Sequence, residues 1–247
     1  MELRSDQRYL IVNADDFGQS RGINRGIIEA FEQGILTSTS FMVRWPAAEE
    51  AATYAREHSD LSLGLHLDLS EWNCRNGEWE CLYQVIDESD PFAVRVEIQR
   101  QLDTFCRIVG HAPTHIDSHQ HVHLHEPAHT VLMEMCGDAG VPIRHCTPRV
   151  QYCGGFYGQD DRGESFPDAI APQGLIRILT ELQPGITELA CHPGYADTLE
   201  TMYRVERATE LRSLCDPDIR AAINDLSITL ISFRDVASLS AGKGATR

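Results

Sequence analysis

The sequence predicts one α/β domain in which parallel strands alternate with helices and close, or nearly close, into a barrel. Short apolar runs of β-forming residues alternate with amphipathic segments along the whole chain. Repeated βα units of this kind imply parallel strands with helices outside them. About seven such units in 247 residues, with no linker or composition break, are enough for a barrel. An open doubly wound sheet is the alternative. We expect residues 1–247 to form a single domain, although the length would also allow two small ones.

The expected strands are short and apolar. Residues 61–69 show the cleanest alternation, because leucine occupies every odd position. The leucines should face the helices, whereas His66 should point into the interior, with Gly64 leaving space below it. The full set of expected strands is 9–14, 36–43, 61–69, 114–118, 141–145, 185–191 and 227–232.

The helices are expected between these strands. Residues 22–33 place Ile23 and Ile27 on one face, and Gly34 marks the C-terminal stop. Residues 46–58 begin with a proline, which is favoured in the first helical turn. The full set is 22–33, 46–58, 92–110, 126–139, 173–182, 202–215 and 218–226. Two polar stretches, 70–90 and 147–172, are expected to be loops.

The composition excludes several partners. With 21 Lys plus Arg against 37 Asp plus Glu, the formal net charge is −16. Nucleic acid and anionic lipid both require a basic patch, so we expect neither as a partner. No apolar run approaches the length of a membrane span, and residues 1–8 are polar and charged, so we expect neither a membrane span nor a secretory signal. The eight cysteines form no CxxC pair and are expected to be reduced, buried thiols in a cytoplasmic protein.

Polar candidates follow the expected strands, at the edge where α/β proteins carry their functional residues. Asp15 and Asp16 end the first strand, and His66 lies near the end of the third. His119 follows the fourth strand and His192 follows the sixth. Five titratable residues at four strand ends indicate a functional site.

These residue types are typical of metal-dependent hydrolysis. One aspartate and two histidines leave open positions on a divalent ion, which polarises a carbonyl and acidifies bound water. The second aspartate would take the water proton, and His192 would protonate the leaving group. Spacing alone leaves open which aspartate is the ligand. Neighbours in a regular strand point to opposite faces, so Asp15 and Asp16 reach one site only if the strand ends between them. Either could instead cap the next helix.

The segment after the fourth strand is rich in histidine. Asp117 and His119 share a face if the chain stays extended, and His119 lies nearest the strand end. Asp117 is expected to orient a neighbouring imidazole. His121, His123 and Arg144 are expected behind the ligands or against the substrate.

Five motifs carry a resemblance to a known family. In chain order they are LIVNADDFG, GILTSTSFMV, LGLHLDL, PTHIDSHQHVH and ELACHPGY. They resemble the signatures of the YdjC-like carbohydrate deacetylases, which include chitooligosaccharide and hopanoid-biosynthesis deacetylases. The resemblance extends from residue 10 to about residue 235. It implies a distorted (β/α) barrel of about seven strands, related to the polysaccharide deacetylases. It also implies removal of acetyl from an N-acetylated sugar, one Mg²⁺ or Zn²⁺ ion, and a homodimer.

The resemblance also implies a role for each matching residue. Asp16, His66 and His119 match the metal ligands of the family. Asp15 matches the general base, and His192 matches the general acid.

Two stretches, 70–90 and 147–171, match no motif of the family. We expect them to form the walls that select the substrate. Aromatic side chains in these stretches are candidate platforms for sugar rings. They are Trp72, Trp79, Tyr152 and Tyr157.

Two other functions remain open from the sequence. Another metal-dependent amidohydrolase or a phosphoesterase would use a second metal, for which His121 and His123 could serve. A non-catalytic sugar-binding barrel is the second alternative. Such a protein has no need of a base, so Asp15 beside a complete ligand set argues against it.

Overall fold

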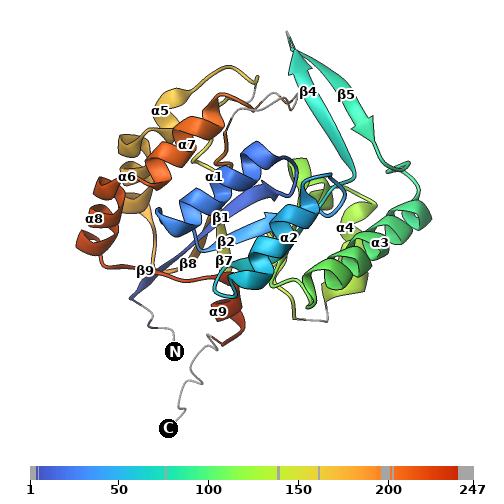
Figure 1. The fold of residues 1–247 in the computed structure, drawn as a ribbon, viewed down its shortest axis with the longest axis horizontal. Coiled ribbons are helices and arrows are strands. Elements are labelled where there is room, and N and C mark those ends of the chain that lie inside the picture. The colour runs from blue at the N-terminus through green and yellow to red at the C-terminus, as the bar shows by residue number, and fades with distance from the viewer. Residues whose placement is uncertain are drawn as a thin grey trace.

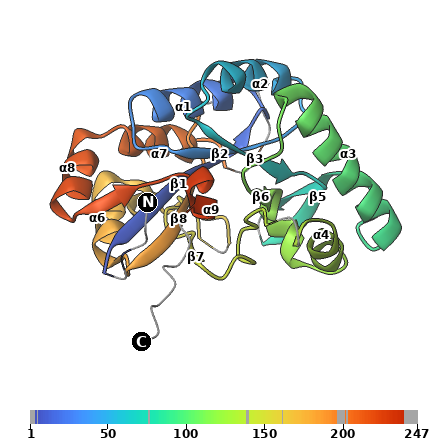
Figure 2. The same ribbon diagram turned by 90° about the horizontal axis from the view of Figure 1, so that it is seen from below.

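Seven strands form one curled parallel sheet with helices around its outer face (Figures 1 and 2). The structure is a computed structural model, which describes residues 4–238 apart from Ser5, Asn76, Asp138, Ala139, Asp161, residues 196–200 and Met202. The strand order is β6-β3-β2-β1-β8-β7, and β9 pairs with the start of β1. The strands are β1 Arg8–Phe17, β2 Ser38–Phe41, β3 Ser62–Leu67, β6 Ile116–Ser118, β7 Val150–Cys153, β8 Gly185–Cys191 and β9 Ile228–Leu230.

The predicted class, a distorted (β/α) barrel of about seven strands, is confirmed, and the barrel is only half closed. Its edges are β6 and β7. The prediction of a strand at 141–145 is wrong, because that segment makes only an isolated bridge between Ile143 and Ile116. The strand β7 lies instead within the stretch expected to be a loop. The segment at 141–145 still matters, because the Arg144 backbone N–H donates to the Ile116 carbonyl at 3.0 Å and places this arginine where the barrel fails to close.

The stretch 70–90, also expected to be a loop, contains an antiparallel hairpin. Its strands are β4 Ser70–Arg75 and β5 Glu78–Gln84. The hairpin projects from the body of the molecule (Figure 1). Its base is fixed by Asp68, which accepts hydrogen bonds from the Tyr83 hydroxyl at 2.7 Å and the Trp45 indole at 3.0 Å. The hairpin is therefore attached to the end of β3 through a buried carboxylate.

The helices follow the expected order. Ser20 caps α1 by accepting from the Ile23 N–H, and Asp90 caps α3 ahead of Pro91. Residues 139 and 202, where two predicted helices end or begin, lie outside the described residues. The helices are α1 Arg21–Glu32, α2 Ala48–Glu57, α3 Pro91–Val109, η1 His119–Leu124, α4 Ala128–Cys136, α5 Pro167–Ile170, α6 Pro172–Glu181, α7 Glu206–Leu214, α8 Pro217–Asp225 and α9 Phe233–Ser238.

Two further expectations concern the cysteines and the membrane. All eight cysteines are free, but the expectation that they are buried is met fully only at Cys136 and Cys191, whereas Cys81 and Cys106 are exposed. Over the described part of the chain, no helix is both long and apolar enough to cross a bilayer.

The strand β1 shows how the two faces of the sheet differ. Leu10 and Val12 pack into the large apolar cluster beneath the helices. Tyr9 and Ile11 point the other way and pack against Phe233 of α9. The helix α9 thus fills the concave face at the N-terminal end of the strands. The polar residues farther along β1 occupy the other end of that face.

Candidate active site

Asp15 and Asp16 lie at a β-bulge near the end of β1. From Ala14 to Phe17 the strand β1 advances three residues, whereas its partner β2 advances only two, from Thr39 to Phe41. Asp16 takes a left-handed backbone conformation, with φ of 71°. The expectation that the strand must end between the two aspartates is wrong. The strand continues to Phe17, and the bulge turns both carboxylates into one cavity.

The turn after the bulge requires glycine. Gly18 has φ of 95°, and a Cβ there would lie 2.7 Å from the Phe41 ring and 2.8 Å from the Met42 carbonyl oxygen. Its N–H donates to the Asn24 side chain at 2.7 Å, which connects the bulge to α1. The motif residues after the aspartates therefore fix the backbone that presents them.

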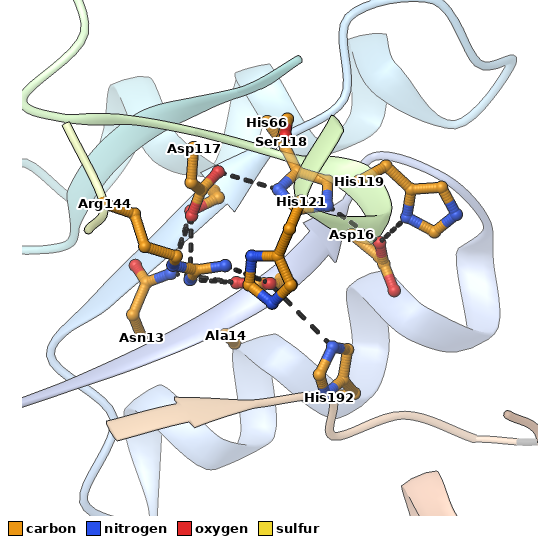
Figure 3. A network of polar contacts seen from close by, with 12 residues as sticks. Asn13, Ala14, Asp16, His66, Asp117, Ser118, His119, His121, Arg144 and His192 are labelled. Carbon is orange, nitrogen blue, oxygen red and sulfur yellow. Dashed lines mark hydrogen bonds and ion pairs between the residues drawn. The ribbon is translucent and has the colours of Figure 1, made fainter. Parts of the chain in front are cut away.

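Asp16, His66 and His119 present donor atoms to one another (Figure 3). Asp16 Oδ1 lies 3.3 Å from His66 Nε2 and 3.2 Å from His119 Nδ1. His66 comes from the inner face of β3, and His119 is the first residue of η1. The three donor atoms lie within 4.8 Å of one another. One carboxylate and two imidazoles suit a divalent ion, so these residues fit the expected metal.

Two of these residues, His66 and Asp16, are oriented by further hydrogen bonds on the side away from the proposed metal. Asp117 Oδ1 lies 2.7 Å from His66 Nδ1, so the other ring nitrogen faces Asp16. Arg207 donates to Asp16 Oδ2 at 2.6 Å, which leaves Oδ1 directed at the histidines. Burial opposes ionisation of Asp16, yet Arg207 and the two imidazoles hold its pKa well below the usual range.

Gly64 leaves the space expected beneath His66, and another histidine fills it. A Cβ at Gly64 would lie 2.4 Å from the His115 ring. That ring stacks on Phe233 with 3.8 Å between centroids. Burial lowers the pKa of His115 to about 4. His115 is thus a neutral interior residue below the site.

Arg144 is the centre of a buried charge network (Figure 3). Its two terminal nitrogens each donate to Asp15 at 2.7 Å. It also lies 2.8 Å from Asp117 Oδ2, and its Nε donates to Glu188 at 2.8 Å. Burial opposes ionisation of Asp15, but the arginine outweighs it and lowers the pKa of that carboxyl.

A second set of donors, Asp15, His66 and Asp117, also lies within ligand distance. Arg144 already pairs with both of its carboxylates. A cation would have to compete with a buried guanidinium there. The set around Asp16 is therefore the better metal site.

His192 follows β8 and lines the same cavity as the donors (Figure 3). Its Nε2 is 3.8 Å from Asp15 Oδ2, too far for a direct hydrogen bond. Its backbone N–H donates to Glu210, whose carboxylate lies 4.0 Å from His192 Nδ1. Burial lowers the pKa of His192 to about 4, although Asp15 and Asp16 favour its charged form. Burial also raises the pKa of Glu210 to about 8.

The other loop histidines have separate positions. His123 lies 2.5 Å from Ser118 Oγ and 3.1 Å from the Arg144 carbonyl, so both ring nitrogens have partners. His121 lines the cavity, with its Nε2 3.3 Å from the Tyr152 hydroxyl. Among the described residues, neither donor set of three includes His121 or His123. Nothing in this geometry favours the second metal that the phosphoesterase alternative requires.

One cavity of about 350 Å³ brings the predicted residues together. Asp15, Asp16, His66, His119 and His192 all line it, as do His121, Tyr152 and Tyr157. Asp117, His123 and Arg144 lie behind it. Trp72 and Trp79 line a neighbouring cavity instead.

Sequence reasoning missed the contribution of α7. Tyr203 lies just before α7, and Arg207 and Glu210, three residues apart, share one face of the helix. All three are buried, and Tyr203 donates to Glu210. A polar stripe at helical spacing was the available signal. It is weak, because most such stripes face solvent.

The chain is similar to known proteins over most of its length. The model of the YdjC-like protein family matches residues 9–225. A carbohydrate deacetylase from Geobacillus stearothermophilus is 34% identical, over 94% of this chain and 99% of its own. A chitooligosaccharide deacetylase from Serratia marcescens is 31% identical, over 93% of this chain and 100% of its own.

Solved structures share the fold. A protein from Enterococcus faecalis V583 superimposes with a TM-score of 0.75 at 24% identity, covering 93% of this chain and 99% of its own. A family 4 acetyl xylan esterase from Clostridium thermocellum, solved with a cobalt ion, gives a TM-score of 0.54 at 11% identity, covering 94% and 91%. At these identities the likeness supports the architecture alone.

Proposed function

This chain belongs to the YdjC-like protein family, and from that premise we propose that it is a metal-dependent hydrolase that removes the acetyl group from an N-acetylated sugar. The convergence of Asp16, His66 and His119 beside a second buried aspartate carries the proposal. The names of its relatives, carbohydrate and chitooligosaccharide deacetylases, support the substrate class.

Asp16, His66 and His119 would hold one divalent ion, Mg²⁺ or Zn²⁺, through Oδ1, Nε2 and Nδ1 respectively. Such an ion would polarise the acetyl carbonyl and lower the pKa of water. Asp117 keeps the His66 ring turned so that Nε2 faces Asp16. Arg207 holds Asp16 in place.

Asp15 is proposed as the general base. Arg144 keeps its carboxylate ionised at neutral pH and fixes its orientation through two hydrogen bonds. The same pairing lowers the basicity of Asp15. The residue therefore suits a water that is already acidified and would be a poor base for an ordinary one.

His192 is proposed as the group that protonates the leaving amine. With a pKa near 4 the imidazole is neutral at pH 7, so it must first receive a proton. Asp15 Oδ2 is the nearest source, 3.8 Å away. The proton that Asp15 takes from water would pass to His192 through a bridging water, because 3.8 Å is too long for a direct hydrogen bond, and then to the sugar nitrogen as the C–N bond breaks. The hydroxyl of the water thereby joins the acyl carbon to give acetic acid, and the other proton of the water joins the nitrogen to give the free amine.

Acetate release from a panel of N-acetylated sugars, with and without chelator, tests the proposal. The expected result is acetate from at least one sugar, loss of release with chelator, and recovery with added Mg²⁺ or Zn²⁺. No acetate from any of them would contradict the assigned activity.

Two variants test the roles. Asp15→Asn should still bind one ion per chain but lose at least about 100-fold in kcat, because general-base catalysis contributes about 10²–10⁴. His66→Ala should lose both the ion and turnover. Most of the activity surviving in Asp15→Asn would show that another group is the base.

A further inference from the structure

A second cavity, of about 530 Å³, adjoins the catalytic one. Gln120 and Tyr157 line both. The strand β4 forms part of the wall between them. Ser70 and Trp72 face the outer cavity, whereas Glu71 faces the catalytic one, because successive side chains of a strand point to opposite sides.

The outer cavity carries two exposed tryptophans on one face of the hairpin. Trp72 pairs with Cys81 across the hairpin, and Trp79 lies two residues before Cys81. The two indoles are therefore diagonal neighbours on the same face. Trp72 is 39% exposed and Trp79 is 59% exposed. Large aromatic surfaces left open beside a polar cavity are typical of a binding site and not of a core.

The hairpin is hydrogen-bonded to the segment that carries His119, one of the three proposed metal ligands. Gln120, directly after His119, accepts from the Trp72 N–H at 2.9 Å and donates to its carbonyl at 2.7 Å. The Tyr83 hydroxyl, on the residue paired with Glu71 at the base of the hairpin, donates to Asp68. Trp72 is thus held at a set position relative to the catalytic cavity, which lowers the entropy cost of binding a ligand across both.

The polar lining of the outer cavity is acidic. Glu88 and Asp160 line it, and its described lining includes no lysine or arginine. Glu88 Oε1 is buried without a hydrogen-bond partner in the described structure, so it can accept from a ligand hydroxyl. Two carboxylates in a described lining that has no lysine or arginine disfavour an anionic ligand.

We infer that the outer cavity binds a second, uncharged sugar unit of the substrate, with Trp72 and Trp79 against the ring and Glu88 accepting from a hydroxyl. The inference rests on the proposed deacetylase activity for the position of the first unit. It makes the substrate a neutral oligosaccharide of at least two units and assigns the preference for chain length to the hairpin.

Acetate kinetics with N-acetylglucosamine and its β-1,4-linked diacetylated disaccharide test the inference. The wild-type protein should show at least about tenfold higher kcat/KM for the disaccharide. Trp79→Ala should remove that advantage, chiefly through KM, and reduce the disaccharide rate far more than the monosaccharide rate. Trp79→Phe should keep most of it. Leu82→Ala is the matched control, because Leu82 is 37% exposed on the same hairpin and is not among the residues lining either cavity.

Several outcomes overturn the inference. One is equal loss for both sugars in Trp79→Ala, which would indicate a structural role. Another is a disaccharide that is no better than the monosaccharide in the wild type. Tighter binding of a phosphorylated disaccharide than of the neutral one would refute the assigned charge preference.

Failure of the proposed deacetylase activity can be distinguished from failure of the outer sugar site. If no sugar releases acetate, the disaccharide stays intact, and its binding to the wild type and to Trp79→Ala can be measured by calorimetry. Saturable binding that weakens about tenfold in the variant would support the outer site without the chemistry. Undetectable binding, or binding equal in both proteins, would overturn it.

Discussion

Replacing Arg144 by methionine should destabilise the protein strongly. The side chain is buried, and its guanidinium pairs with Asp15, Asp117 and Glu188. Methionine is of similar length but carries no charge, so three carboxylates would be left without their cation. Removing one partner of a buried ion pair costs about 3–5 kcal/mol. In a chain of this size 1 kcal/mol corresponds to about 2–4 °C. The melting temperature should therefore fall by roughly 6–20 °C.

The loss should depend on pH in a defined direction. Without Arg144 the burial of Asp15 and Glu188 raises their folded pKa values above the unfolded value of about 4. Below pH 4 both states are protonated, so the penalty is small. Above pH 4 the carboxyls ionise in the unfolded state while they stay protonated in the folded variant. The loss of unfolding free energy therefore grows towards neutral pH. Denaturant unfolding of wild type and variant at pH 5 and pH 8 measures the change.

Arg95→Met is the matched control. Arg95 pairs with Glu134 at the surface, where the two side chains are 45% and 56% exposed. An exposed pair contributes about 0–1 kcal/mol. Equal losses of unfolding free energy in the two variants would refute the reasoning that Arg144 is the structural centre of the site.

Three further predictions concern single residues. Arg207→Met should weaken metal binding about 10–100-fold in a titration, with an unchanged circular dichroism spectrum, because Asp16 loses the group that orients it. Wild-type unfolding free energy should fall as pH drops from about 6.5 to 4, since His115 has a folded pKa of about 4 and the unfolded histidine takes up the proton first. His115→Gln should lose up to about 3 kcal/mol of that pH dependence, as measured by denaturant unfolding at both pH values. Tyr83→Phe should cost about 1–3 kcal/mol in the same assay, because it leaves one oxygen of buried Asp68 without its hydroxyl donor.

Secondary structure was predictable where the pattern was periodic. The alternation through residues 61–69 identified β3 and the inward direction of His66. The stretches 70–90 and 147–172 were misjudged, because polar composition outweighed a short alternating pattern. Strands β4, β5 and β7 have exposed or half-exposed faces, so they lack the apolar signal of the central strands.

The histidine-rich loop could not be resolved from spacing. An extended chain would place alternate residues from Asp117 onward on one face. The backbone instead takes positive φ at Gln120 and His121, which breaks the alternation directly after His119. His123 is thereby turned behind the site, and His121 stays at the cavity wall.

The sequence by itself determined the α/β class, the order of the central strands along the chain, and the positions of Asp15, Asp16, His66, His119 and His192 at strand ends. These follow from local periodicity, which each segment carries within itself. It could not determine how both aspartates reach one cavity. That depended on a bulge, which arises from the unequal register of β1 and β2.

Only the tertiary structure decided the charge balance of the site. Arg144 lies 129 residues from Asp15, and Arg207 lies 191 residues from Asp16. No local pattern links such partners. Burial makes their pairing decisive, because a carboxylate removed from water stays ionised only beside a compensating cation. The residues that act are therefore visible in the chain, whereas the groups that set their charge and direction appear only when it folds.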